Sequence, residues 1–312
     1  MAYPTKTGVI IVDLLERKNI RALNFMNVHD IKYHINQNNF KEYLMLVIYN
    51  GIKLLDINNN YNIINIEGEK WNKFSRYTMF FPENTNNEYL IATEFDWYYG
   101  ETYYSNTVTT KLFSLNEKKD KVIFCNYYYI HDDYGQKGEN INTIVYLLVW
   151  HNERNNNYYI IQFAQKIIIT NIFTSELYCE FLSDAENGCI YNKEINNTKN
   201  AYLCIARNYN IVIYDLYKKE EDKIIRPFHH LINIFKWNEK YIIVIDGYLD
   251  KEEQKKTNVS LKVIDLENKK VISKFEGKHA NKISYIKKIN HPIYGESLLS
   301  GGVDDAIKLW VV

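Results

Sequence analysis

The sequence is poor in proline and cysteine, has no excess of either charge and contains no long apolar run. Four Pro and four Cys occur in 312 residues, and 38 Lys and Arg balance 38 Asp and Glu. Proteins dedicated to nucleic acid or to anionic membranes need clustered positive charge, so this balance argues against both classes. We therefore expect neither nucleic acid nor a membrane surface as a partner.

The cysteines show neither the paired C-x-x-C spacing of a zinc site nor the density of a disulfide framework. They stand at Cys125, Cys179, Cys189 and Cys204. Residues 1–8 contain no apolar segment of a secretion signal, and no run approaches the ~18 apolar residues that cross a bilayer. We expect a cytoplasmic or nucleocytoplasmic protein without structural disulfides, bound metal or cofactor.

Apolar residues are nevertheless abundant, at 46% of the chain, and they recur in a pattern. The pattern is a β-branched or aromatic run, then Asp or a small polar residue, then a turn. Its copies are marked by positions 13, 56, 114, 174, 215, 265 and 311. Intervals of 41 to 60 residues approach the roughly 40 to 45 residues of a four-stranded propeller blade, with insertions in the two longest.

Between two markers the chain divides into four short runs typical of β-strands. After Asp56 these runs are 61–66, 75–81, 89–93 and 107–113, rich in Tyr, Ile, Phe and Thr and separated by turn residues. Helical periodicity is scarce. The sequence therefore predicts an all-β fold, and the repeat favours a β-propeller of four-stranded antiparallel blades over a sandwich.

The last copy of the pattern is the most specific. It runs from GKH at 277–279 to LLSGGVDDAIKLW at 298–310, and it closely resembles a WD40 repeat. The resemblance implies a hydrogen-bonded structural tetrad within the blade, formed by His279, Ser300, Asp304 and Trp310. Other copies have a different residue in place of the Trp, namely Tyr214, Ile264, Leu55, Val12 and Phe113.

Ring closure depends on the two ends of the chain. Six blades close if residues 20–25 pair with residues 307–311, which leaves the run 9–12 surplus. Seven blades would require strands that the patterns do not reveal, or a chain that is a fragment. We expect a single propeller domain over 1–312, closed by this strand pairing, because an open ring leaves unpaired edge strands.

The longest polar segments between strands are expected on one face of the propeller. If the strands of a blade are called a, b, c and d, segments 96–106 and 246–258 are b–c loops and segment 131–140 is a d–a loop. Antiparallel strands place b–c and d–a loops on the same face. In WD40 proteins this face frequently binds partners, and loops on rigid scaffolds often carry recognition.

The first of these segments is rich in aromatic residues. Trp97, Tyr99 and Tyr103 are the expected anchors for a partner, since exposed aromatic residues are enriched at binding hot spots. Asp132 and Asp133, in the d–a segment, would supply charge selectivity at the rim. The alternative is that the aromatic residues extend strands b and c and pack between blades.

No motif for a chemical reaction is present. The sequence lacks the G-x-x-x-x-G-K-S/T phosphate loop, the G-x-S-x-G elbow and H-E-x-x-H. We expect a non-catalytic scaffold that binds proteins or peptides, as a monomer within a larger complex. The alternative is a propeller hydrolase with acidic residues at the channel mouth, for which the candidates are Asp96, Asp132, Asp133 and Asp246.

Overall fold

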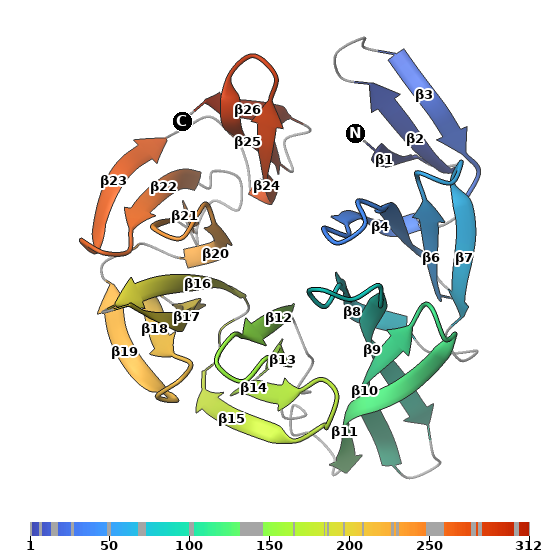
Figure 1. The fold of residues 1–312 in the computed structure, drawn as a ribbon, viewed down its shortest axis with the longest axis horizontal. Coiled ribbons are helices and arrows are strands. Elements are labelled where there is room, and N and C mark those ends of the chain that lie inside the picture. The colour runs from blue at the N-terminus through green and yellow to red at the C-terminus, as the bar shows by residue number, and fades with distance from the viewer. Residues whose placement is uncertain are drawn as a thin grey trace. The chain divides into compact units, whose positions relative to one another are not determined.

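The structure of the protein is a computed structural model. It describes all residues except 1, 6–7, 14–17, 26–27, 49–50, 68–72, 100–102, 132–145, 165, 184, 186, 196, 208, 226–227, 229–230, 248–258, 276–278, 280–282, 303–305 and 312. The regular secondary structure of the described residues consists of β-strands alone (Figure 1). None of these residues belongs to a helix that is long and apolar enough to cross a membrane.

In the described part of the chain the strands form seven antiparallel sheets, each made of consecutive strands. Five sheets have four strands, a to d in chain order: β4 (Val28–Ile35), β5 (Glu42–Ile48), β6 (Gly51–Asp56) and β7 (Asn62–Glu67); β8 (Lys73–Phe80), β9 (Tyr89–Tyr99), β10 (Tyr103–Ser114) and β11 (Lys119–His131); β12 (Tyr146–Asn152), β13 (Asn157–Phe163), β14 (Lys166–Asn171) and β15 (Leu177–Leu182); β16 (Gly188–Ile195), β17 (Thr198–Arg207), β18 (Asn210–Asp215) and β19 (Glu220–Ile225); β20 (Leu231–Lys236), β21 (Tyr241–Gly247), β22 (Val259–Asp265) and β23 (Lys270–Phe275). Two sheets have three strands: β1 (Ala2–Thr5), β2 (Gly8–Asp13) and β3 (Lys18–Leu23); β24 (Ile283–His291), β25 (Gly295–Gly302) and β26 (Ile307–Val311).

The fold class predicted from the sequence, an all-β propeller of four-stranded antiparallel blades, is confirmed. Five blades are complete within the described residues, and β24 to β26 supply three strands of the sixth in the predicted count. The predicted fourth strand corresponds to β3, which pairs with β2, so β3 and β26 belong to different sheets. The described residues do not pair these two strands; closure of the ring between them, and the single domain over 1–312, stay predictions.

Burial follows the position of a strand within its sheet. All but the end residues of β5 and all but the first residue of β13 are buried, because neighbouring structure covers both faces of these inner strands. The outer strands β19 and β23 are mostly exposed, and they contain Glu and Lys. Charged outer strands fit the edge position, where apolar residues would invite aggregation.

The chain divides into two compact units, which comprise residues 1–151, 156–160 and 170–178, and residues 152–155, 161–169 and 179–312. Within each unit, buried residues of neighbouring sheets form shared cores. In the first unit Met45 of β5 belongs to the same core as Leu90 of β9. In the second, Ile213 of β18 belongs to the same core as Ile242 of β21. Burial of this apolar surface, at about 25 cal/mol per Å², is the main force that holds the sheets together.

The recurring Asp at the end of strand c has a structural role. Oδ1 of Asp215 accepts hydrogen bonds from the N–H groups of Tyr217 (2.9 Å) and Lys218 (3.0 Å), and Lys219 has a φ of 62°. Asp265 caps the next c–d hairpin with the same pattern of bonds. Such side chains supply the acceptor that a tight turn lacks. The periodic Asp therefore marks hairpins and is no sign of chemistry.

Candidate functional site

The sheet β8–β11 contains the longest strands of the described residues. β9, β10 and β11 have 11, 12 and 13 residues, whereas no other described strand exceeds 10 (Figure 1). β8 pairs with β9 only as far as Phe95, which lies opposite Lys73. Beyond that row the three strands continue together, over residues 96–99, 103–107 and 127–131. We call these residues the β9–β11 extension.

The β9–β11 extension is unusually aromatic. Eight of its 14 residues are Trp or Tyr. Its ladders place Trp97 opposite Asn106, which in turn lies opposite Tyr128, and they place Tyr99 opposite Tyr104. Successive rows of an antiparallel sheet face opposite sides, so aromatic residues interact across the strands within one row or two rows apart. The extension therefore concentrates aromatic residues on a hydrogen-bonded backbone, four in the rows that contain Trp97 and Tyr99 and four in the alternate rows.

The sequence prediction of a loop over 96–106 is wrong for most of this segment. Trp97 and Tyr99 belong to β9, and Tyr103 begins β10. The strands continue because Trp, Tyr and Thr favour extended backbone and are paired row by row across the sheet. Asp132 and Asp133, the other residues of the predicted partner site, lie outside the described residues.

Three members of the predicted tetrad come together in the last sheet. Nε1 of Trp310 donates a hydrogen bond to Oγ of Ser300 at 2.7 Å, and Nε2 of His279 lies 2.7 Å from the same Oγ. All three residues are buried. Asp304, the fourth member, is not among the described residues. The arrangement satisfies polar groups inside a core, so its role is structural.

Asp246, one of the carboxylates on which the alternative hydrolase depends, is already paired. It lies in β21 and forms an ion pair with Nζ of Lys262 in β22, where the two side chains are 1% and 10% exposed. The same Nζ lies 5.2 Å from the ring centre of Phe228. A buried charge needs such a partner, so the role of Asp246 is to balance Lys262.

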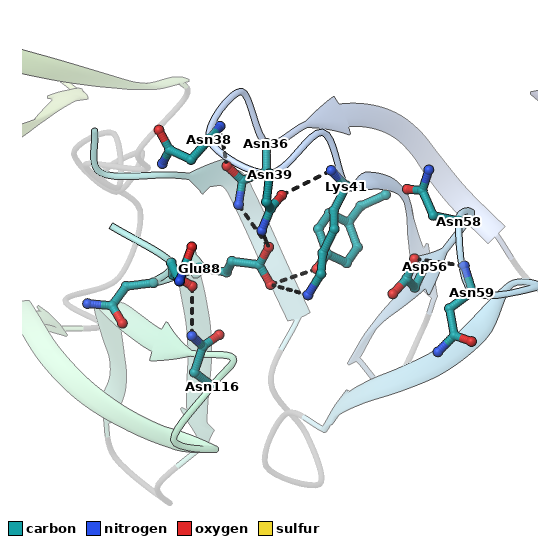
Figure 2. Close-up of polar contacts among 12 residues, drawn as sticks. Asn36, Asn38, Asn39, Lys41, Asp56, Asn58, Asn59, Glu88 and Asn116 are labelled. Carbon is teal, nitrogen blue, oxygen red and sulfur yellow. Dashed lines mark hydrogen bonds and ion pairs between the residues drawn. The ribbon is translucent and has the colours of Figure 1, made fainter. Parts of the chain in front are cut away.

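A second buried carboxylate, that of Glu88, lies among hairpins of the first unit (Figure 2). Oε1 of Glu88 accepts hydrogen bonds from Nδ2 of Asn36 (2.8 Å) and Asn39 (3.3 Å), and Oε2 accepts one from the hydroxyl of Tyr43 (2.6 Å). Nζ of Lys41 lies 3.9 Å from Oε2. Burial and the bond to Glu88 raise the pKa of Tyr43 well above its usual range. This carboxylate joins sheet β4–β7 to the turn before β9.

Asparagine side chains hold the same hairpins to one another (Figure 2). Nδ2 of Asn38 donates hydrogen bonds to the carbonyl groups of Pro82 (2.7 Å) and Thr85 (3.0 Å). Nδ2 of Asn116 donates to the carbonyl of Asn86 at 2.8 Å. These amides satisfy backbone groups of the protein itself, so their role is to stiffen the a–b and c–d hairpins.

Sequence reasoning did not find Glu88 or Lys262. The sequence does contain a signal for Lys262, because a lysine inside an apolar run that is typical of a buried strand requires a carboxylate within reach. Glu88 has none, because its buried partners Asn36 and Tyr43 are 52 and 45 residues away in sequence. Among the described residues, no three His, Cys, Asp or Glu side chains form a group that could hold a metal ion.

No family model matches the sequence, and no curated protein matches it either. Solved structures match the fold. The BBS1N protein, solved in complex with ARL6DN, has a TM-score of 0.61 and 10% identity over 100% of this chain and 91% of that chain. The computationally designed Ika8 protein has a TM-score of 0.55 and 12% identity, with 100% and 92% covered. The dihydro-heme d1 dehydrogenase NirN, in complex with DHE, has a TM-score of 0.52 and 10% identity, with 98% and 71% covered. At these identities the likeness shows a β-propeller fold and nothing more.

Proposed function

We propose that the protein is a non-catalytic scaffold that binds a protein or peptide through the β9–β11 extension and the neighbouring b–c and d–a loops. The observation that carries this proposal is the extension itself, an aromatic region on paired strands that continue beyond β8. Trp and Tyr bury a large area at a small cost in side-chain entropy. A backbone that is already paired lowers the ordering cost of binding further.

Within this proposal, Trp97, Tyr99 and Tyr103 anchor the partner, and Asp132 and Asp133 select for its charge at the rim. Central aromatic anchors supply most of the affinity of an interface, while rim charges mainly tune the rate of association. Membership of the WD40 family is part of the proposal and rests on the His279, Ser300 and Trp310 contacts of the last repeat. BBS1N, a propeller solved with a protein partner, illustrates this use of the fold.

The alternative, a propeller hydrolase, gains no support from the described residues. Asp246 is neutralised by Lys262, and the side chains of Asp96, Asp132 and Asp133 lie outside the described part of the chain. A catalytic carboxylate needs access to substrate and a pKa matched to its task. We therefore propose binding without catalysis.

The proposal is tested with the tagged full-length protein, by affinity purification from the cells that make it. Trp97→Ala combined with Tyr99→Ala should remove the main partners and leave the melting temperature within a few degrees. A matched control is Phe40→Ala combined with Tyr294→Ala, which removes two exposed aromatic side chains from a–b hairpins and should leave the partners unchanged. Partners that persist on the folded Trp97/Tyr99 variant would show that the binding surface is elsewhere.

A further inference from the structure

Two thiols face each other across neighbouring strands in the core of the second unit. Cys189 of β16 and Cys204 of β17 occupy directly opposite positions of an antiparallel ladder, and both are free cysteines with buried side chains. Opposite residues in such ladders have Cα atoms about 4.5 to 5.5 Å apart. A disulfide spans Cα separations of about 4.4 to 6.8 Å, so this backbone already has the spacing that a disulfide needs.

The two side chains also contact each other. Burial and a hydrogen bond with Cys189 raise the pKa of the Cys204 thiol well above its ordinary value. The preceding residue, Gly188, has no room for a side chain, because a Cβ there would lie 2.6 Å from the carbonyl oxygen of Cys204. The dipeptide Gly188-Cys189 therefore brings β16 close to β17 in the row that contains both thiols.

The surroundings exclude most other uses for these thiols. The next row on the same face holds Tyr191 and Tyr202, whose rings stack at 5.0 Å with an interplanar angle of 18°. Within the described residues no third His, Cys, Asp or Glu completes a metal site with the pair. Two sulfur atoms held together in this way can be oxidised by two electrons to a disulfide.

We propose that Cys189 and Cys204 are an oxidisable pair that forms a cross-strand disulfide when the protein meets a hydroperoxide. The thiolate of one cysteine attacks the peroxide oxygen, gives a sulfenic acid and releases water or an alcohol. The second thiol then attacks that sulfur, its proton leaves with the hydroxyl group as water, and the S–S bond forms. The two sulfur atoms lose two electrons in total, and the peroxide gains them.

Local opening of the strands controls the rate of this reaction. Only a thiolate attacks the peroxide, and burial together with the hydrogen bond to Cys189 raises the pKa of the Cys204 thiol. Cys189, at 6% exposed against 0% for Cys204, is the residue that a small oxidant reaches first. Once formed, the bond joins β16 to β17 and restricts the unfolded chain between residues 189 and 204. Oxidation therefore stabilises this sheet.

The test uses the full chain, reduced, purified and exposed to hydrogen peroxide at neutral pH while folded. Alkylation after denaturation should find two of the four thiols protected, and mass spectrometry should find the Cys189 and Cys204 peptides joined. The melting temperature should rise by roughly 5 °C and return when dithiothreitol is added. Cys189→Ala and Cys204→Ala should each abolish the protection and the rise.

Cys179→Ala is the matched control, since Cys179 lies in β15 and is only half-buried, and this variant should behave like the unmodified chain. Four reactive thiols after peroxide treatment would overturn the proposal. Protection that persists in Cys189→Ala, or joined peptides that contain Cys125 or Cys179, would overturn it as well. If an alanine variant fails to fold, the peptide map of the unmodified protein decides alone.

Discussion

The indole N–H of Trp310 donates a hydrogen bond to the hydroxyl of Ser300 across two adjacent strands, at 2.7 Å. The same hydroxyl is hydrogen-bonded to His279, so the one hydroxyl of Ser300 is the hydrogen-bond partner of two large buried side chains. The ring of Phe275, from the preceding sheet, meets Trp310 edge-on at 5.5 Å. The bond therefore fixes the side chain that joins the last two sheets of the second unit.

Two substitutions of Trp310 should separate the contribution of its apolar contacts to stability from that of its hydrogen bond. Trp310→Ala removes a large buried side chain and should lower the free energy of unfolding by about 3 to 5 kcal/mol. Trp310→Phe keeps most of the apolar contact and loses the hydrogen bond, so it should cost about 1 to 2 kcal/mol. Urea unfolding of the two variants measures both. A Trp310→Phe variant as stable as the natural chain would mean that the bond to Ser300 contributes nothing.

Removing one charge of the Asp246–Lys262 ion pair should destabilise the protein more than removing both charges together would suggest. Asp246→Asn or Lys262→Met alone leaves one buried charge without its partner and should cost about 3 to 5 kcal/mol. Asp246→Asn combined with Lys262→Met removes both charges and should cost much less than the sum of the single changes. A double-mutant cycle from urea unfolding measures the coupling. Additive costs would show that the two charges do not interact.

The Asp265 cap should make stability depend on pH in the acid range. Hydrogen bonds from the N–H of Asn268, then from its side chain and from the N–H of Glu267, lower the pKa of Asp265 below its ordinary 3.8. A carboxyl whose pKa is lowered by folding stabilises the protein above its ordinary pKa, and this contribution is lost as the pH falls through the lower folded pKa. Asp265→Asn keeps the acceptor and loses the charge.

Asp265→Asn should therefore be less stable than the natural chain at pH 7 and approach it near pH 2. Asp265→Ala, which also removes the acceptor, should be less stable than Asp265→Asn at both values. Thermal unfolding across this pH range measures the difference. A gap between the natural chain and Asp265→Asn that stays constant with pH would show that the charge has no part in the cap.

Ring closure is predicted to require the N-terminal residues. β26 is the last strand of its sheet, and Ile307, Leu309 and Val311 are exposed along it beside a groove of about 330 Å³. Deleting residues 1–26 should lower the melting temperature, because an uncovered apolar edge strand is costly and prone to aggregation. An unchanged melting temperature would count against closure by residues 20–25.

The repeat in the sequence was sufficient to predict the fold, because each blade repeats the same local requirements. The apolar runs, the Asp of the c–d hairpin and the turn residues all recur, and each has a local cause. β1 had no such signal, since it has four residues and one of them is Pro4. The sequence leaves open whether segment 96–106 is a loop or an extension of strands b and c, because a Tyr-rich polar segment is compatible with both; the structure shows the extension.

The candidate site could be located from the sequence only in part. Trp97, Tyr99 and Tyr103 were chosen as loop residues and lie in strands. Their composition was visible, but the register that aligns them with β11 depends on pairing over the whole sheet. The last repeat resembles a WD40 repeat, and this resemblance is enough to predict the contacts of His279, Ser300 and Trp310. The bonds around Glu88 join residues far apart in sequence, and no local pattern encodes them.

The most direct test of the binding proposal is hydrogen–deuterium exchange of the full-length protein with and without its purified main partner. Binding at the β9–β11 extension should slow exchange at amides of residues 96–107 and 127–133 and cause little change at the a–b hairpin residues 36–41. Protection confined to the hairpins, or to another sheet, would contradict the assignment of the β9–β11 extension as the binding surface.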